Sequence, residues 1–402
     1  MLKKLVVNTG VQILGKGISL VVSLLTTGLL TRKLGTEIYG EFILITAMST
    51  FFDTLADFGT SIIGVREASK KETEAERVQV WSNMALLRLI LAGFSLGLGL
   101  ILIYSWPDFE TIRTEAVLAW SMMILTSLAG SLAIVWQTRI KMELKVVVEV
   151  LFPTVFLVCL WIYKGEISLI WVFGTYLLAR MVTLAMGWQM IGGVIDFRKC
   201  DWEKMRHYLK LSWPMGLYLM IFGAYDRAID SMMIRRFLGV NEVAWYGLAY
   251  KIYAVLQQPA YYLVSGIFPI LSGKNNNKKS LFYGSAIALT VGAASLLLGV
   301  WIFAPLMIQI LAGDGFEAAV PVLRILSIAL IFSYLGHLVG FTLISRDGQK
   351  EMLGTGIVVL SFNLIANLVI IPRYGIGGAA IVTVITEAIS LLLMGWKLKK
   401  RG

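Results

Sequence analysis

Long apolar runs follow one another along the whole chain, separated by short polar segments. A run of about 20 mostly apolar residues can cross the ~30 Å hydrocarbon layer of a membrane as a helix. The pattern predicts about twelve such spans, at residues 9–32, 40–63, 84–106, 115–136, 146–163, 167–189, 211–234, 243–271, 282–311, 318–344, 352–371 and 376–396. We therefore expect an all-α integral membrane protein.

Polar positions inside these spans recur at steps of three or four residues, so each set falls on one helix face. Gln12 and Lys16 share such a face in the first span, and Asp53 and Asp57 share one in the second. A charge facing lipid at a helix centre costs about 2.5–3.5 kcal/mol on insertion scales, so such residues face protein or water. The charged residues at membrane depth are Lys16, Arg88, Arg180, Arg227, Lys251 and Arg324, with Asp53, Asp57, Asp226, Asp230 and Glu387.

Depth along the spans suggests two charge pairs. Lys16 and Asp57 lie at similar distances from the inner boundary, and Asp230 and Lys251 lie at similar distances from the outer one. Each pair fits either a gate or a static strut, and the sequence leaves both open. Asn363 and Asn367 fit a polar contact between helices.

The span 243–271 contains polar residues that lie too deep for the interfacial belt of aromatic side chains. Tyr253 and Gln257 offer an aromatic face and hydrogen bonds, which suit a sugar. The alternative is core packing with a kink at Pro259.

Composition supports the membrane assignment, with 57% hydrophobic and 15% charged residues and a mean hydropathy of +0.77. The formal charge of +11 could indicate nucleic acid, but most Lys and Arg fall in the segments on one side of the membrane. By the positive-inside rule this side is cytoplasmic, with both termini there, and the charge gives no reason to invoke nucleic acid. Cys159 and Cys200 are separated by the topology, and no metal-ligating spacing occurs. We expect no metal centre and no cofactor, apart from a coupling ion such as H⁺ or Na⁺.

An internal repeat divides the chain. "TRKLGTEIYGEF" and "IRRFLGVNEVAWYGLAY" both place a basic pair and Leu-Gly before Tyr-Gly, and the two halves end on "LAMGW" and "LLMGW". We expect two pseudo-symmetric six-helix bundles, residues 1–195 and 211–402, joined by a cytoplasmic linker at 196–210. Transporters are commonly built from such repeats.

The motifs "LLTRKLGTEIYGEFILITAMSTFFDTLADFGTSIIGVREAS", "GAYDRAIDSMMIRRFLGVNEVAWYGLAYKIY", "GDGFEAAVPVLRIL" and "NLIANLVIIPRYGIGGAAIVTVITE" span nearly the whole sequence. They resemble the polysaccharide-transport branch of the multidrug/oligosaccharidyl-lipid/polysaccharide (MOP) exporter superfamily. The resemblance implies a V-shaped transporter in the cytoplasmic membrane of a bacterium or archaeon. It implies a flippase that moves undecaprenyl-pyrophosphate-linked oligosaccharide repeat units to the periplasmic or outer leaflet by alternating access. Membrane lipids and polysaccharide polymerase and chain-length machinery are the implied partners.

The resemblance also assigns roles to the polar residues. A cationic cavity suits a pyrophosphate, and the residues that would carry this role are Lys16, Arg88, Arg180, Arg227 and Lys251. Tyr253 and Gln257, which suit a sugar, complete the set of candidate cargo-binding residues. The acidic residues are candidates for gating or for binding a coupling cation, namely Asp53, Asp57, Asp226 and Asp230.

Two other functions fit parts of the sequence. A cation-coupled multidrug exporter of the same superfamily would use the acidic residues, although the basic residues at membrane depth disfavour it. A membrane-embedded glycosyltransferase or polymerase usually carries catalytic carboxylates on large loops, and the loops between the predicted spans are short. We expect a transporter and no enzyme.

Overall fold

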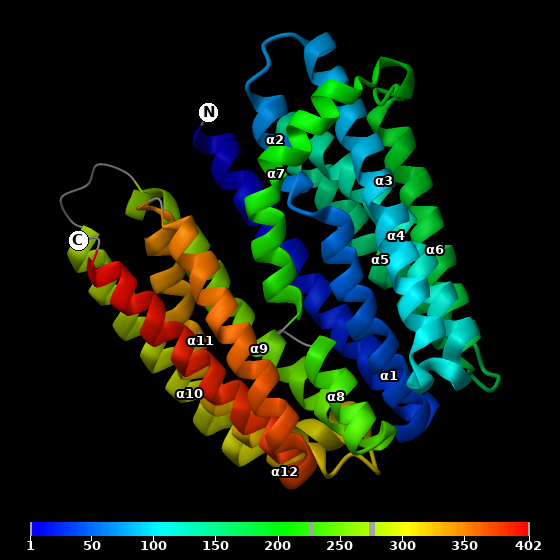
Figure 1. Ribbon diagram of the computed structural model, residues 1–402, viewed down its shortest axis with the longest axis vertical. Helices are drawn as coiled ribbons and strands as arrows, with labels where there is room; N and C mark the ends of the chain where they lie inside the picture. Colours follow the sequence, from blue (N-terminus) through cyan, green and yellow to red (C-terminus); the bar gives the residue numbers. More distant parts are fainter. Residues whose placement is uncertain (1, 225–227, 273–277, 347, 401–402) are drawn as a thin grey trace. The chain divides into compact units, whose positions relative to one another are not determined.

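The computed structural model describes residues 2–224, 228–272, 278–346 and 348–400, and all regular elements in these ranges are helices (Figure 1). The elements are α1 Leu2–Asp57, α2 Thr60–Ser69, α3 Glu74–Ser105, η1 Pro107–Ile112, α4 Arg113–Thr138, α5 Met142–Ile162, α6 Leu169–Ile191, η2 Phe197–Lys199, α7 Trp202–Gly223, α8 Ile229–Phe237, α9 Val240–Ser272, α10 Lys278–Ala312, α11 Ala319–Ile344 and α12 Gln349–Lys400.

Eight helices in the described ranges are long and apolar enough to cross a membrane. Two of them, α1 and α12, contain 56 and 52 residues, more than twice the length that a single span needs. Each is interrupted by a glycine with positive φ, Gly35 at 69° and Gly375 at 63°, a backbone conformation that glycine adopts readily. Both glycines lie between two predicted spans, so α1 and α12 each contain more than one span. The predicted all-helical membrane fold is confirmed.

The other predicted spans also have helical counterparts. Span 40–63 continues from α1 into α2 across a break at Phe58 and Gly59, and span 211–234 covers parts of α7 and α8. The predicted Asp226 and Arg227 lie outside the described residues, between α7 and α8.

The chain forms two compact units. The first contains Met1–Leu34 and Ile45–Gly223, and the second contains Gly35–Leu44 and Ala224–Gly402. The two units agree with the two halves of the sequence repeat only approximately. The exceptions are α7, which belongs to the first unit, and a short piece of α1, which belongs to the second. The functional division into bundles of residues 1–195 and 211–402 stays a prediction.

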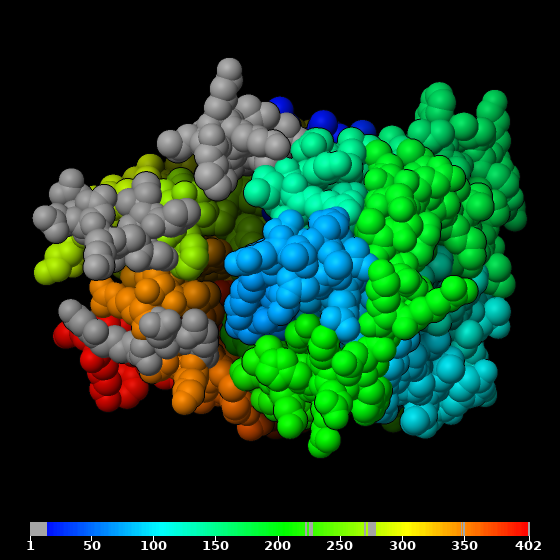
Figure 2. Space-filling model, turned by 90° about the horizontal axis from the view of Figure 1, so that it is seen from above, coloured from blue at the N-terminus to red at the C-terminus, as the bar shows by residue number. Residues whose placement is uncertain are grey.

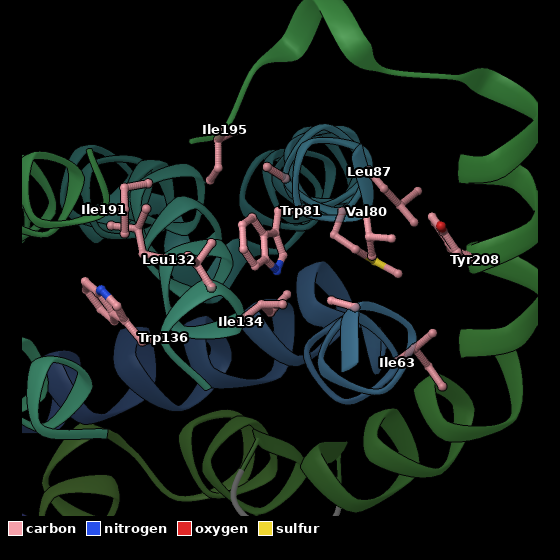
Figure 3. Packing of buried hydrophobic residues seen from close by; sticks show 14 of the residues in the cluster. Ile63, Val80, Trp81, Leu87, Leu132, Ile134, Trp136, Ile191, Ile195 and Tyr208 are labelled. Atoms are coloured by element: carbon pink, nitrogen blue, oxygen red, sulfur yellow. The ribbon is translucent and has the colours of Figure 1, made fainter. Parts of the chain in front are cut away.

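A hydrophobic cluster of buried residues holds the first unit together at the end where α2 meets α3 (Figure 3). Trp81 of α3 is 1% exposed, and Leu132 and Val135 of α4 are fully buried against the same cluster. Met205 and Tyr208 of α7 also belong to this cluster. α7 is therefore anchored in the first unit by its N-terminal half.

The predicted linker at 196–210 forms ordered structure, with η2 in its first part and α7 from Trp202. Ser82 Oγ accepts from the Asp196 backbone N–H at 2.9 Å, and Asn83 Oδ1 accepts from that of Asp201 at 2.7 Å. The segment around residue 200 lies beside the α2–α3 region on the face shown in Figure 2. These side chains satisfy buried backbone donors, so the segment is fixed on α3.

Close helix contacts in the second unit involve the repeated Tyr-Gly motif. A Cβ on Gly40 of α1 would stand 2.1 Å from the Val240 carbonyl oxygen, and one on Gly247 of α9 would stand 2.5 Å from Ile43 Cγ2. Tyr39, beside Gly40, is 1% exposed and contacts the Phe316 ring edge to face at 5.7 Å. Both repeat glycines therefore permit the 35–44 segment and α9 to approach each other closely.

This contact predicts unequal effects of adding a methyl group. Gly40→Ala should destabilise the protein by about 1–3 kcal/mol, because its new Cβ would meet a backbone oxygen that cannot move aside. Gly247→Ala should cost less, since the Ile43 side chain can shift. Gly97→Ala is the matched control, because a Cβ there meets nothing within 4 Å. Thermal unfolding of the purified variants measures the order, and equal stability of Gly40→Ala and Gly97→Ala would contradict the contact.

Candidate functional site

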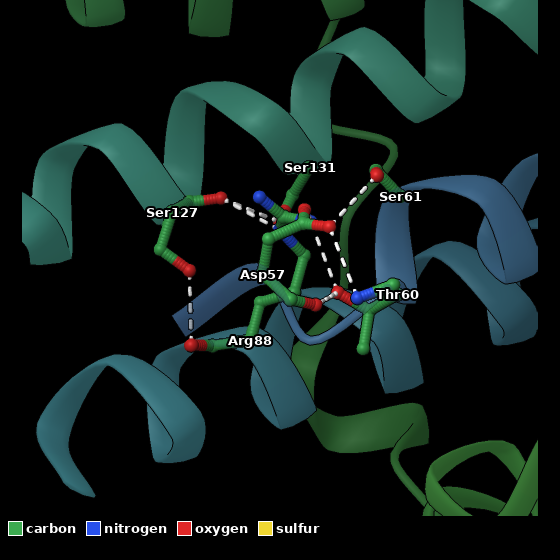
Figure 4. Close-up of polar contacts among 7 residues, drawn as sticks. Asp57, Thr60, Ser61, Arg88, Ser127 and Ser131 are labelled. Carbon is green, nitrogen blue, oxygen red and sulfur yellow. Dashed lines mark hydrogen bonds and ion pairs between the residues drawn. The ribbon is translucent and has the colours of Figure 1, made fainter. Parts of the chain in front are cut away.

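A cluster of charged and hydroxyl side chains lies inside the first unit, where α1 ends and α2 begins (Figure 4). The chain breaks here at Phe58 and Gly59, whose φ angles are 41° and 74°. Asp57 Oδ2 accepts from the Gly59 backbone N–H at 3.2 Å and from Ser61 Oγ at 2.9 Å. The carboxylate thus satisfies donors that the helix break leaves open.

Arg88 of α3 binds the other oxygen of this carboxylate. Its Nη1 forms an ion pair with Asp57 Oδ1 and also donates to Thr60 Oγ1 at 3.0 Å. Its Nε donates to the Ser127 carbonyl of α4 at 3.0 Å, and Ser127 Oγ donates back to the Arg88 carbonyl at 2.9 Å. The Arg88 side chain is only 5% exposed. One guanidinium therefore connects α1, α2, α3 and α4.

The absence of a side chain at Gly130 of α4 leaves room for this guanidinium. A Cβ on Gly130 of α4 would stand 2.1 Å from Arg88 Nη2. Because Arg88 is buried and its Nε and Nη1 donate within the protein, it is not available for cargo in this structure. In this structure Arg88 joins helices of the first unit, and its predicted cargo-binding role stays a prediction. The predicted pairing of Lys16 with Asp57 is wrong for this structure, since Asp57 pairs with Arg88.

Arg180 of α6 has a different environment. Its Cζ lies 3.9 Å from the ring centroid of Phe152 on α5, well inside the about 6 Å range of a cation–π contact. The buried Nε has no hydrogen-bond partner among the described residues. None of the ion pairs found in the described ranges includes Arg180. Arg180 thus has a donor that the surrounding protein does not use.

Aromatic side chains surround this contact. The Tyr176 ring meets Phe152 at 4.6 Å and Phe156 at 5.0 Å between centroids, both nearly perpendicular. Asp53 of α1 lies within electrostatic range of Arg180, without forming an ion pair with it. The site therefore combines one guanidinium, an aromatic surface and a more distant carboxylate.

Lys16 lies near α5. Lys145 and Glu149 of that helix are its electrostatic neighbours, and they pair with each other at 3.6 Å. A Cβ on Gly15 would stand 2.1 Å from Val146 Cγ1, so α1 and α5 approach closely here. A cargo contact at Lys16 stays a prediction.

A second polar cluster lies inside the second unit, around Asp230 of α8. Asp230 is 1% exposed and accepts from Tyr246 Oη and from Asn367 Nδ2, both at 2.7 Å. Asn367 Nδ2 also donates to Asn363 Oδ1 at 3.3 Å, and Thr383 Oγ1 lies 3.1 Å from Tyr246 Oη. The cluster therefore joins α8, α9 and α12.

One oxygen in this cluster has no hydrogen-bond partner in the part of the chain that the structure describes. Asn367 Oδ1 is buried and accepts no hydrogen bond from the described residues. Such an oxygen costs free energy unless something binds it. The sequence indicated only a contact between helices for Asn363 and Asn367, because nothing in their spacing places them beside Asp230.

Of the predicted sugar-binding residues of α9, Tyr253 lies in the interior of the second unit and Gln257 is half-buried. Tyr253 is 1% exposed, and its Oη accepts from Gln257 Nε2 at 2.7 Å. The Tyr250 ring packs on Tyr253 edge to face at 5.5 Å. This arrangement favours the core-packing alternative for Tyr253. Pairing of Lys251 with Asp230 stays a prediction.

Comparison with known proteins identifies the family. Residues 2–275 match the family described as "Polysaccharide biosynthesis protein". An uncharacterized membrane protein, MJ1068, of Methanocaldococcus jannaschii is 30% identical over 244 residues, which cover 56% of this chain and 47% of that protein. The "Probable low-salt glycan biosynthesis flippase Agl15" of Haloferax volcanii is 26% identical over 223 residues, 54% of this chain and 47% of that protein. The chain thus aligns with about half the length of each of these curated relatives.

Solved structures show the same fold at low sequence identity. The lipid II flippase MurJ in an inward closed conformation has a TM-score of 0.81 at 14% identity, covering 96% of this chain and 87% of that one. An inward-facing multidrug resistance MATE transporter of the MOP superfamily has a TM-score of 0.74 at 15% identity, covering 97% of both chains. These chains share the fold of this multi-pass membrane protein. Because the family match covers more than half of the sequence, the chain belongs to the polysaccharide biosynthesis protein family.

Proposed function

We propose that this chain is a flippase that moves oligosaccharide repeat units linked to undecaprenyl pyrophosphate across the cytoplasmic membrane by alternating access. The Lys- and Arg-rich side faces the cytoplasm, and the repeat unit leaves on the opposite side for polymerisation by partner proteins. The role is transport, and no catalytic step is assigned to the chain. Two similar proteins, a probable glycan biosynthesis flippase and a lipid II flippase, support this class of cargo.

The observation that carries the proposal is that no hydrogen bond or ion pair among the described residues engages the Arg180 guanidinium. The residue lies 11 positions into α6, which is roughly 16 Å along the helix at 1.5 Å per residue and therefore deep in the span. A guanidinium at such depth is costly and is commonly functional. Its planar, forked donors suit a phosphate oxygen pair. Arg88, by contrast, is neutralised by Asp57.

The proposal predicts different results for two arginines at membrane depth. Arg180→Ala should abolish surface polysaccharide while the protein still reaches the membrane, because a charge-assisted contact contributes about 1.5–3 kcal/mol, or roughly ten- to hundred-fold in affinity. Arg180→Lys should retain part of the activity, since the charge remains but the planar fork is lost. Arg324→Ala is the control, because Arg324 Nε donates to the Trp301 carbonyl at 3.1 Å and Arg324 is not one of the candidate cargo-binding residues.

Polysaccharide display, accumulation of lipid-linked intermediates and drug susceptibility are measured in one strain set. Normal display in Arg180→Ala together with drug sensitivity in Asp53→Asn would contradict the flippase function. That result would favour the alternative, a cation-coupled multidrug exporter, whose fold the chain also shares.

We also propose that Asp230 and Asn367 bind the cation that couples transport. The Asp230 carboxylate and the unpartnered Asn367 carbonyl oxygen belong to one buried cluster. Carboxylate and amide oxygens are ligands for hard cations, whereas an amide carbonyl does not hold a proton near neutral pH. The free oxygen of Asn367 therefore favours Na⁺ over H⁺.

Purified protein should unfold at a higher temperature in NaCl than in choline chloride of equal concentration, because a cation that binds only the folded state stabilises it. Asp230→Asn and Asn367→Leu should remove this difference, and Asp53→Asn should keep it. Equal unfolding temperatures of the wild-type protein in the two salts would exclude a sodium site, and a difference that persists in Asp230→Asn would place it elsewhere.

A further inference from the structure

Phe152 supports the guanidinium of Arg180 from one side. At 3.9 Å between Cζ and the ring centroid, the guanidinium lies against the aromatic face. The attraction is electrostatic and comes from the negative face of the ring. It needs no N–H donor, because the donors of a guanidinium point outward in its own plane.

Arg88 and Arg180, the two arginines of the first unit that the sequence places at membrane depth, show how much this difference matters. Arg88 binds a carboxylate, a hydroxyl and a backbone carbonyl, so its Nε and Nη1 donors already bond to groups within the protein. Arg180 is held by a ring, and its Nε has no partner among the described residues. An aromatic support fixes a cation and leaves its donors for another group.

We propose that Phe152 is a positioning residue, which holds the Arg180 guanidinium on its ring so that the unused donors bind the diphosphate of a lipid-linked substrate. This inference rests on the proposed function and adds the part of the site that orients its cation. Phe152 itself does not touch the diphosphate. Its role is to fix the guanidinium, so that less conformational entropy is lost when the anion binds.

Neighbouring groups fix the ring in turn. Tyr176, one helical turn before Arg180 on α6, contacts Phe152 edge to face at 4.6 Å. It contacts Phe156 in the same way at 5.0 Å. Phe156 lies one turn after Phe152 on α5, is 3% exposed and forms no cation–π contact among the described residues. The chain therefore provides a control ring with the same helix and the same tyrosine neighbour.

The test measures binding of geranyl diphosphate, a water-soluble prenyl diphosphate, to purified protein by calorimetric titration. Phe152→Leu should raise the Kd by about two- to thirty-fold, the range expected for a cation–π contact, whereas Phe156→Leu should leave it unchanged. Phe152→Trp should bind as tightly as the wild type or more tightly, because indole is the best cation–π partner. A purely structural role would make the larger Trp at least as harmful as Leu. If Phe152→Leu protein does not accumulate, Phe152→Met replaces it with the same expectation.

The Arg180→Ala background separates the two proposals. In that background Phe152→Leu should cause no further loss of binding. Unchanged binding in Arg180→Ala alone would contradict the role of Arg180 in the proposed function. Weakened binding in Arg180→Ala, together with equal effects of Phe152→Leu and Phe156→Leu, would overturn the positioning role and leave the function standing.

Discussion

The cost of keeping charge inside apolar helices determines most of this structure. Each charged group at membrane depth needs a counter-charge, hydrogen bonds or an aromatic face. The first unit uses different solutions for Arg88 and Arg180, its two arginines at this depth. Arg88 is compensated by Asp57 and joins four helices at the α1–α2 break. Arg180 is compensated weakly, by the ring of Phe152 and the more distant Asp53. The first arrangement stabilises the unit, and the second leaves a cation able to bind an anion.

The second unit meets the same constraint with neutral donors. Asp230 accepts hydrogen bonds from the phenol of Tyr246 and the amide of Asn367. The unpartnered oxygen of Asn367 beside it fits the proposed role of this cluster in binding a coupling cation. On this account the first unit recognises the anionic cargo and the second responds to the coupling ion.

The membrane fold was predictable because each span is a local property of the sequence. A run of apolar residues specifies its own helix in lipid, and glycines such as Gly35 mark the turns. The partners of the charged residues were not predictable. Arg88 is fixed by the Ser127 carbonyl, 39 residues away, and Tyr253 is buried by packing rather than by its position in the span. Sequence depth suggested Lys16 as the partner of Asp57, but depth gives no information on the rotation of one helix against another.

Direct observation of lipid-linked sugar crossing a bilayer tests the central claim. Purified protein is reconstituted into vesicles with an undecaprenyl-pyrophosphate-linked glycan that carries a fluorophore, and an impermeant reductant added outside destroys only the fluorophores that reach the outer leaflet. The account predicts that the protected fraction falls rapidly with wild-type protein and remains near that of protein-free vesicles with Arg180→Gln. A wild-type protein that transfers the glycan no faster than protein-free vesicles, or an Arg180→Gln variant as fast as the wild type, would contradict it.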